Sequence, residues 1–477
     1  MMARRKGATN LVSITFQLAK YRLENLRGEG ITVGLTIVSF AIVSAITYLV
    51  ATGTYMFYQR SEHADQFFGD LQLGSAAASA YVLLSALALS LLLGPLVNLA
   101  GLASVLAATS RETRLAGMRL LGVSNWAVMR IAALETMLQA AAGAAIGLLA
   151  AFLALPALKN LSFQGIALSW QEMFMPPAYY GACALAIILF SGVAAVFGLR
   201  RVIVSPLGVS RKALPRRPRL WRVVLLLTGI GAAYVIPVWF TEGGISVGVG
   251  LVIAIILLLV AGFSAVMPLL LRLVARIFTA AKNPVVSVAM WRIVASPRNT
   301  WRRVSGVGIL SFIAAIAVLL PASIPGIEIP KEERFVRAVL MDVRVGALLT
   351  ILFGFILAAG ATLLSSMSHE FEHLNHSYAL ARMGAKDSFA LKVSAAEAII
   401  PVAGVCLLGY LLGSINAGPL AIFFNSAGTP LRSASPVLSA LVGLGVVVAG
   451  IAMVSLATAI TIPIHRQIMA RHKRRAD

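Results

Sequence analysis

The strongest constraint on this chain is a series of long apolar runs without a charged residue, such as 31–57 and 75–109. A helix of about 20 apolar residues is long enough to cross the hydrocarbon core of a bilayer. Hydrophobic residues make up 59% of the chain and charged residues 12%, whereas soluble domains have about 25% charged residues. We therefore predict an all-α, polytopic membrane protein.

The apolar runs predict about ten transmembrane helices. We place them near 31–57, 75–109, 126–156, 178–199, 222–240, 245–271, 304–325, 343–368, 389–414 and 437–464. Prolines in the two long basic loops, 200–222 and 272–303, are expected to break helices, so these loops form two boundaries between groups of spans. The spans then divide four, two and four.

This division predicts four segments. They are a cytoplasmic or interfacial elbow (1–30), a first four-helix unit (31–211), a two-helix connector (212–281) and a second four-helix unit with a basic tail (282–477).

The placement of basic residues predicts the orientation. With the amino terminus inside, the inner segments hold 33 of the 40 Lys and Arg residues, as the positive-inside rule requires. Both termini are then cytoplasmic. The net charge of +22 is spread over short clusters between apolar runs, so we expect no nucleic-acid partner. The first run is too long for a signal-peptide core and is expected to stay in the protein. The Arg-rich, Ala-rich composition favours a bacterial plasma membrane.

An internal repeat appears at an offset of 262 residues. Gly122 matches Gly384, Glu135 matches Glu397, and Gly147 matches Gly409. The offset spans six predicted helices, an even number, so the two copies point the same way across the membrane. These parallel repeats differ from the inverted repeats common among secondary transporters.

The first copy resembles the FtsX/MacB-like permeases, the membrane subunits of one class of ATP-binding cassette (ABC) transporters. The likeness rests on Arg111-Glu112, on Leu120-Leu121-Gly122-Val123-Ser124, on Glu135 with Gly147, and on Ser205-Pro206-Leu207. The ten-helix layout looks like the subgroup that exports, or confers resistance to, antimicrobial peptides. Two departures stand out: segment 326–342 replaces a large extracellular domain, and His373-Leu374 replaces the Arg-Glu pair in the second copy.

The resemblance implies that inner segments of both repeats dock on a cytoplasmic ATPase. In the first repeat these residues are Arg111, Glu112, Arg114, Arg119, Gly122, Val123 and Ser124; in the second they are Arg382, Gly384, Ala385 and Lys386. Arginines suit charge-assisted docking, and Gly122 can end one helix before another begins near Ser124. Positive-inside anchoring with an ordinary helix–helix turn is the alternative.

Two carboxylates, Glu135 and Glu397, are expected about ten residues inside their spans, where a charge is expensive. We interpret them, with Gly147 and Gly409, as residues that couple neighbouring helices. Proton or substrate chemistry is the alternative.

The segment His369-Glu370-Phe371-Glu372-His373 matches H-E-x-x-H, with His376 as a further possible ligand. It lies where a span leaves the membrane, so we expect a solvated, ATPase-facing helix end and no metal site. No Gly is followed by Lys, which excludes a phosphate-binding P-loop. The chain itself is thus predicted to be no enzyme and to hold no cofactor, with ATP and Mg in the partner ATPase. The only cysteines, Cys183 and Cys406, allow neither a disulfide framework nor a zinc cluster.

The predicted function is a permease subunit that couples two copies of the ATPase to export or extraction of a hydrophobic peptide, drug or lipid. Relaying ATPase motion to an outer partner or sensor, without transport, is the alternative. An ion-driven secondary transporter conflicts with the parallel repeats and with the few intramembrane charges.

Overall fold

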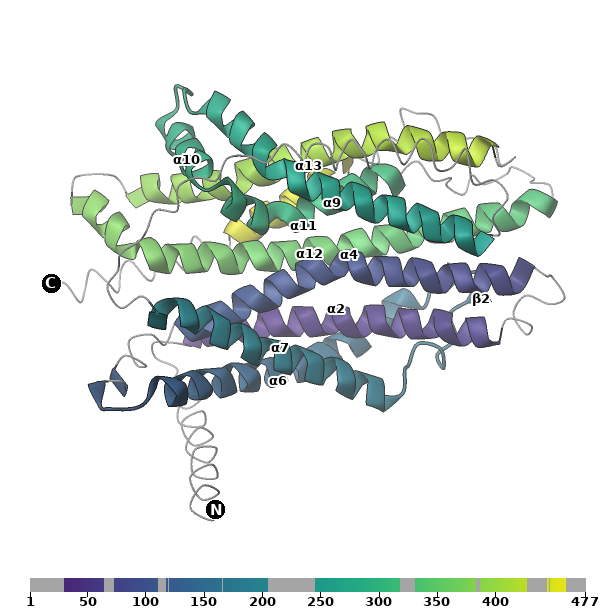
Figure 1. Cartoon of the computed structure of the whole chain (residues 1–477), viewed down its shortest axis with the longest axis horizontal. Helices are drawn as coiled ribbons and strands as arrows, with labels where there is room; N and C mark the ends of the chain where they lie inside the picture. Colours follow the sequence, from purple (N-terminus) through teal and green to yellow (C-terminus); the bar gives the residue numbers. More distant parts are fainter. Residues whose placement is uncertain are drawn as a thin grey trace, which may run out of the picture. The chain divides into compact units, whose positions relative to one another are not determined.

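The computed structural model of the chain is all-α and polytopic (Figure 1). It describes residues 30–63, 73–109, 117–118, 120–164, 166–204, 245–317, 331–382, 387–426, 444–445 and 447–459. Within these residues, seven helices are long and apolar enough to cross a membrane. The all-α membrane fold is therefore confirmed.

Most helices begin and end near the predicted spans. They are α2 (Gly30–Glu62), α4 (Leu73–Thr109), α6 (Asn125–Leu158), α7 (Pro177–Val204), α9 (Ile245–Phe278), α10 (Pro284–Ala295), α11 (Pro297–Ala317), α12 (Lys331–Arg382) and α13 (Asp387–Ser426), followed by a shorter apolar helix, Val447–Ala459. Two short antiparallel strands, β1 (Ser162–Phe163) and β2 (Ile166–Ala167), form a hairpin between α6 and α7. Residues 1–29 of the predicted elbow (1–30) and the predicted span at 222–240 lie outside the described residues.

The prolines of the basic loop 272–303 begin helices as well as separating them. Pro284 is at the start of α10, whose N-cap Asn283 accepts a hydrogen bond from the Val285 amide at 3.0 Å. Pro297 is the first residue of α11. A proline fits the first helical turn because its missing N–H has no helical partner there. The basic loop predicted at 272–303 thus contains a 12-residue helix, α10.

Helix α12 is much longer than the span predicted at 343–368. Its 52 residues include the end of the predicted outer segment 326–342 and part of the inner segment 369–392. Helical hydrogen bonds are formed within the segment itself, so the helix does not have to end where the apolar residues end.

The helices of the chain pack into two compact units. Unit 1 comprises 1–50, 96–157 and 174–215; unit 2 comprises 51–95, 158–173 and 216–477. The boundary passes through α2 and α4, and it falls directly after Pro95 inside α4. The four-segment division from the sequence stays a prediction.

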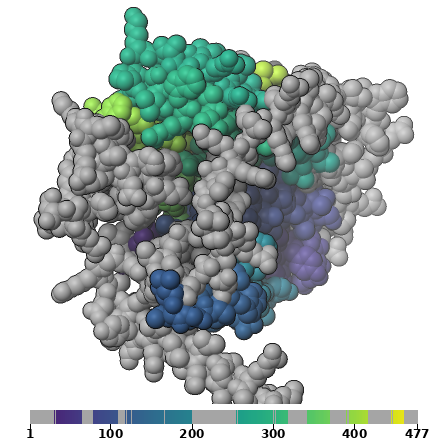
Figure 2. All heavy atoms as spheres, turned by 60° about the vertical axis from the view of Figure 1, so that its left-hand side comes forward, coloured from purple at the N-terminus to yellow at the C-terminus, as the bar shows by residue number. Residues whose placement is uncertain are grey.

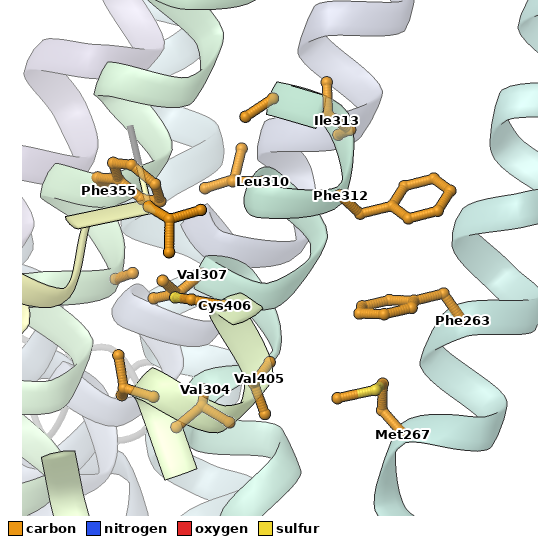
Figure 3. Packing of buried hydrophobic residues seen from close by; sticks show 14 of the residues in the cluster. Phe263, Met267, Val304, Val307, Leu310, Phe312, Ile313, Phe355, Val405 and Cys406 are labelled. Carbon is orange, nitrogen blue, oxygen red and sulfur yellow. The ribbon is translucent and has the colours of Figure 1, made fainter. Parts of the chain in front are cut away.

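The core of unit 2 is built around α11. Helices α11, α12 and α13 lie side by side, with α9 against α11 (Figure 1). Phe312 of α11 stacks on Phe263 of α9, with ring centroids 5.4 Å apart, while Leu310 points toward Phe355 of α12 and Val405 packs close by (Figure 3). These contacts pack α9, α11, α12 and α13 of unit 2 against one another.

Candidate functional site

The turn that leads into α6 has the geometry predicted for a docking segment. Gly122 has φ +87°, a conformation that favours glycine. The Val123 amide donates to the Met118 carbonyl at 3.1 Å, and the Ser124 hydroxyl accepts from the Ala127 amide at 3.3 Å. Ser124 therefore caps α6, which begins at Asn125. The helix break at Gly122 and the new start are confirmed.

This turn exposes large apolar side chains that the sequence interpretation did not single out. Leu120 and Leu121 are 90% and 86% exposed, and Trp126 is 54% exposed. Behind them, Met118 and Val123 pack on the buried Val128 and Ala132 of α6. The two leucines thus project from a turn that is fixed to its helix. The sequence did contain a sign of this exposed pair, because two leucines stand directly before the glycine that ends the helix, Gly122.

The charged residues of the predicted docking segments are largely outside the described part of the chain. Arg111, Glu112, Arg114 and Arg119 fall there, as do Gly384, Ala385 and Lys386. Arg382 is the last residue of α12. The docking role of all these residues stays a prediction. The side chains of His369, His373 and His376 are likewise not described.

The two predicted intramembrane carboxylates occupy equivalent positions. Glu135 is the eleventh residue of α6 and Glu397 the eleventh of α13. Glu135 is 5% exposed. Glu397 pairs with Arg292 of α10 at 3.2 Å and with Arg303 of α11 at 3.7 Å. Glu397 therefore joins α13 to two other helices, an arrangement that suits the predicted helix coupling.

The matched glycines are also equivalent in the contacts they allow. A Cβ on Gly147 would lie 2.6 Å from the Ala41 carbonyl oxygen of α2, and one on Gly409 would lie 2.6 Å from the Gly308 carbonyl oxygen of α11. Both distances are below van der Waals contact, so only glycine permits these backbones to approach so closely. In the first copy, α6, which carries Glu135, crosses α2 at Gly147. In the second copy, α13, which carries Glu397, crosses α11 at Gly409.

A buried arginine in unit 2 forms a polar cluster that sequence patterns did not reveal. Arg60, 1% exposed, lies near the end of α2 and pairs with Glu172 at 2.9 and 3.0 Å. Its remaining donor group reaches the Phe163 carbonyl at 3.0 Å and the Gln164 side-chain oxygen at 3.2 Å. Hydrogen bonds from Arg60 lower the pKa of Glu172 to about 2. Arg60 thereby fixes the β1–β2 hairpin on α2.

The same hairpin is attached to α12. The Asp342 carboxylate accepts from the Gln164 amide and from the Tyr81 hydroxyl, both at 2.6 Å. We call Arg60, Glu172, Gln164, Tyr81 and Asp342 the Arg60 network. It connects α2, the hairpin, α4 and α12 within unit 2. No sequence spacing signals it, because its members are up to 282 positions apart.

Among the described residues, no group of three His, Cys, Asp or Glu side chains is placed to hold a metal ion. The arrangement is one of helix crossings, buried ion pairs and an exposed turn, which suits the transmission of movement between helices.

Comparison with known families agrees with this description. The family described as FtsX-like permease C-terminal matches residues 85–206, which include most of α4 and all of α6 and α7. The exposed turn, Glu135 and Gly147 all lie in the matched region. A comparison with curated proteins found no match. The chain is therefore a multi-pass membrane protein that contains an FtsX-like permease domain at residues 85–206, the domain of permease subunits of the ABC-transporter type.

Proposed function

We propose that this permease couples a separate cytoplasmic ATPase to the export or extraction of a hydrophobic or amphipathic substrate, such as a peptide, drug or lipid. The observation that carries the proposal is the exposed Leu120–Leu121 turn at the start of α6. It lies inside the FtsX-like region.

Exposed leucines at a rigid turn are typical of a surface that a partner covers. Burying a leucine side chain stabilises a contact by about 1.5–3 kcal/mol. The Ser124 cap and the packing of Val123 on Val128 hold the turn in one conformation, so little ordering is needed on docking. The neighbouring Arg111, Arg114 and Arg119 would add charge-assisted contacts to an acidic surface of the ATPase.

Helix α6 offers a route for the transmitted force. A push on the Leu120–Leu121 turn acts directly on the helix that carries Glu135 and Gly147. Gly147 places α6 in backbone contact with α2, so movement of α6 is passed to its neighbour. The second repeat contains the corresponding pair, Glu397 and Gly409, on α13.

One chain would serve two ATPase subunits, since it contains two such repeats. A purified complex is expected to hold one permease chain and two ATPase chains, measured by native mass spectrometry. Two permease chains for each ATPase pair would refute this stoichiometry.

Charge placed on the exposed turn tests the coupling. Leu120→Glu plus Leu121→Glu should abolish co-purification with the ATPase while leaving membrane insertion unchanged. The control is Lys282→Glu, a charge reversal at an exposed position between α9 and α10, which should retain the ATPase. If the double variant binds the ATPase as the unchanged chain does, the turn is not the docking surface.

Relay of ATPase motion to an outer partner, without a transported substrate, is the second candidate. The Arg60 network favours it, because it ties an extramembrane hairpin to α2, α4 and α12. Reconstituted vesicles separate the two candidates. ATP-driven accumulation of a hydrophobic peptide or dye supports transport, whereas ATP hydrolysis without movement of any tested class supports the relay.

A further inference from the structure

A cavity in unit 2 combines one arginine with several hydroxyl groups. It lies between α11, α12 and α13, and Arg303 and Glu397 are in its lining. The hydroxyl-bearing residues that line it are Thr300, Thr362, Ser365, Ser366 and Ser394. Val304 and Ala398 complete the lining. Serine and threonine are common between transmembrane helices, so the unusual feature of this cavity is the arginine and carboxylate beside them.

The charges around the cavity are unequal. The Glu397 carboxylate is shared by two guanidinium groups, those of Arg292 and Arg303. Glu397 is 12% exposed at its side chain, whereas Arg292 and Arg303 are 41% and 37% exposed. Among the described side chains here, two arginines share one carboxylate, and the arginines are more exposed than the carboxylate. Guanidinium groups offer several donors in a planar fork that matches phosphate oxygens.

The position of the cavity fits the edge of the apolar layer. Along the chain, Ser365 and Ser366 come just before the charged segment that begins at His369-Glu370, and Ser394 comes just after Lys392. Phospholipid phosphates lie at this depth. A basic pocket between transmembrane helices is typical of sites for anionic lipid headgroups.

Helix α10 has the character of a helix lying at the membrane surface. Its buried residues Ala289, Met290 and Ile293 pack on α9 and α13, while Trp291 is 63% exposed. Tryptophan is enriched at membrane interfaces. Arg292, which pairs with the cavity residue Glu397, follows Trp291 directly. Figure 2 shows residues of the α9–α11 region (teal) at the surface.

We propose that this cavity binds the phosphodiester group of an anionic membrane phospholipid. Arg303 binds the phosphate oxygens, the Ser365, Ser366 and Ser394 hydroxyls donate to them, Arg292 adds positive charge beside the cavity, and the acyl chains extend along the apolar faces of the helices. Binding in the cavity would hold α10 and α13 against α11, because Arg292, Glu397 and Arg303 come from these three helices. The site would make the second repeat sensitive to the lipid around it.

Lipid binding by the purified full chain tests the proposal without any ATPase, so its failure would leave the proposed coupling untouched. The probe is phosphatidylglycerol, measured by native mass spectrometry against phosphatidylcholine. Arg303→Gln should weaken phosphatidylglycerol binding roughly tenfold. The control is Arg298→Gln, which removes an exposed charge from the same helix and should leave binding unchanged.

A second variant avoids disturbing the ion pairs. Ser366→Leu fills the cavity without removing a charge and should also weaken binding. If the Arg298 and Arg303 variants lost phosphatidylglycerol binding equally, the effect would be one of general surface charge, and the proposed site would be overturned. Displacement of the lipid by millimolar inorganic phosphate would assign the cavity to a soluble anion and overturn the lipid assignment.

Discussion

Replacing Glu172 with glutamine removes one negative charge from the Arg60 network and keeps the size of the side chain. Arg60 is 1% exposed, so its guanidinium would stay buried without the carboxylate that neutralises it. The Gln164 oxygen and the Phe163 carbonyl would remain as acceptors. The change therefore tests the ion pair more than the packing.

The expected loss of stability is about 3 kcal/mol. Removing one partner of a buried ion pair costs about 3–5 kcal/mol. Glu172 keeps 18% of its side-chain exposure, which places the cost at the lower end, because water can partly replace the lost contact. A loss of this size raises the fraction of opened molecules on the order of 100-fold.

A buried thiol offers a direct assay. Cys406 is fully buried in the core of unit 2, the unit that also contains the Arg60 network. Replacing Cys183, the other cysteine of the chain, with alanine leaves Cys406 as the single probe. Its rate of labelling by a maleimide in detergent reports the opening of unit 2 and should rise on the order of 100-fold in the Glu172→Gln variant, if closing is faster than labelling.

The matched control is Glu62→Gln. Glu62 is exposed at the end of α2 and accepts a hydrogen bond from Tyr58 at 2.6 Å. The same chemical change there should alter labelling by less than about twofold. If Glu172→Gln labels Cys406 no faster than this control, the ion pair contributes nothing to the stability of unit 2, and our reasoning about the buried arginine is wrong.

Two further predictions use the same Cys406 assay, and a third is measured as an acid-unfolding profile by circular dichroism. Gly409→Ala should open unit 2 markedly, because its Cβ would meet the Gly308 carbonyl, whereas Gly404→Ala meets nothing within 4 Å and should be tolerated; equal effects would contradict the close crossing. Phe312→Ala should cost about 3–5 kcal/mol, since Phe312 is 0% exposed; labelling within twofold of the unchanged protein would count against it. The lowered pKa of Glu172 stabilises the fold at neutral pH, and this contribution should disappear as pH falls from the ordinary carboxyl range toward about 2; a Glu172→Gln variant with the same acid profile would show that another group is responsible.

The sequence predicted the spans well because each is specified locally. The apolar run at 126–156 became α6, and Gly122 with Ser124 marked its start through glycine conformation and capping. Helix ends beyond the apolar core were less predictable. Lys331 and the charged residues after it continue α12, because helical hydrogen bonding does not depend on hydropathy.

The candidate site could be predicted only in part. Glu397 and Gly409 were found through the repeat, which is visible along the chain. Their partners Arg292 and Gly308 were not, since an ion pair or a helix crossing depends on which helices pack together. The pairing of Arg60 with Glu172, 112 positions apart, has the same cause.

The crossing at Gly147 divides α6 into unequal arms. From Asn125 to Gly147 the helix is about 33 Å long, and from Gly147 to Leu158 about 17 Å, at 1.5 Å for each residue. If α6 tilts as a rigid rod about this fulcrum, its far end moves about half as far as the end near Leu121, and in the opposite direction. The position of Gly147 thus sets the ratio of the two movements. A larger displacement with a smaller force at the Asn125 end would become a smaller displacement with a larger force at the Leu158 end.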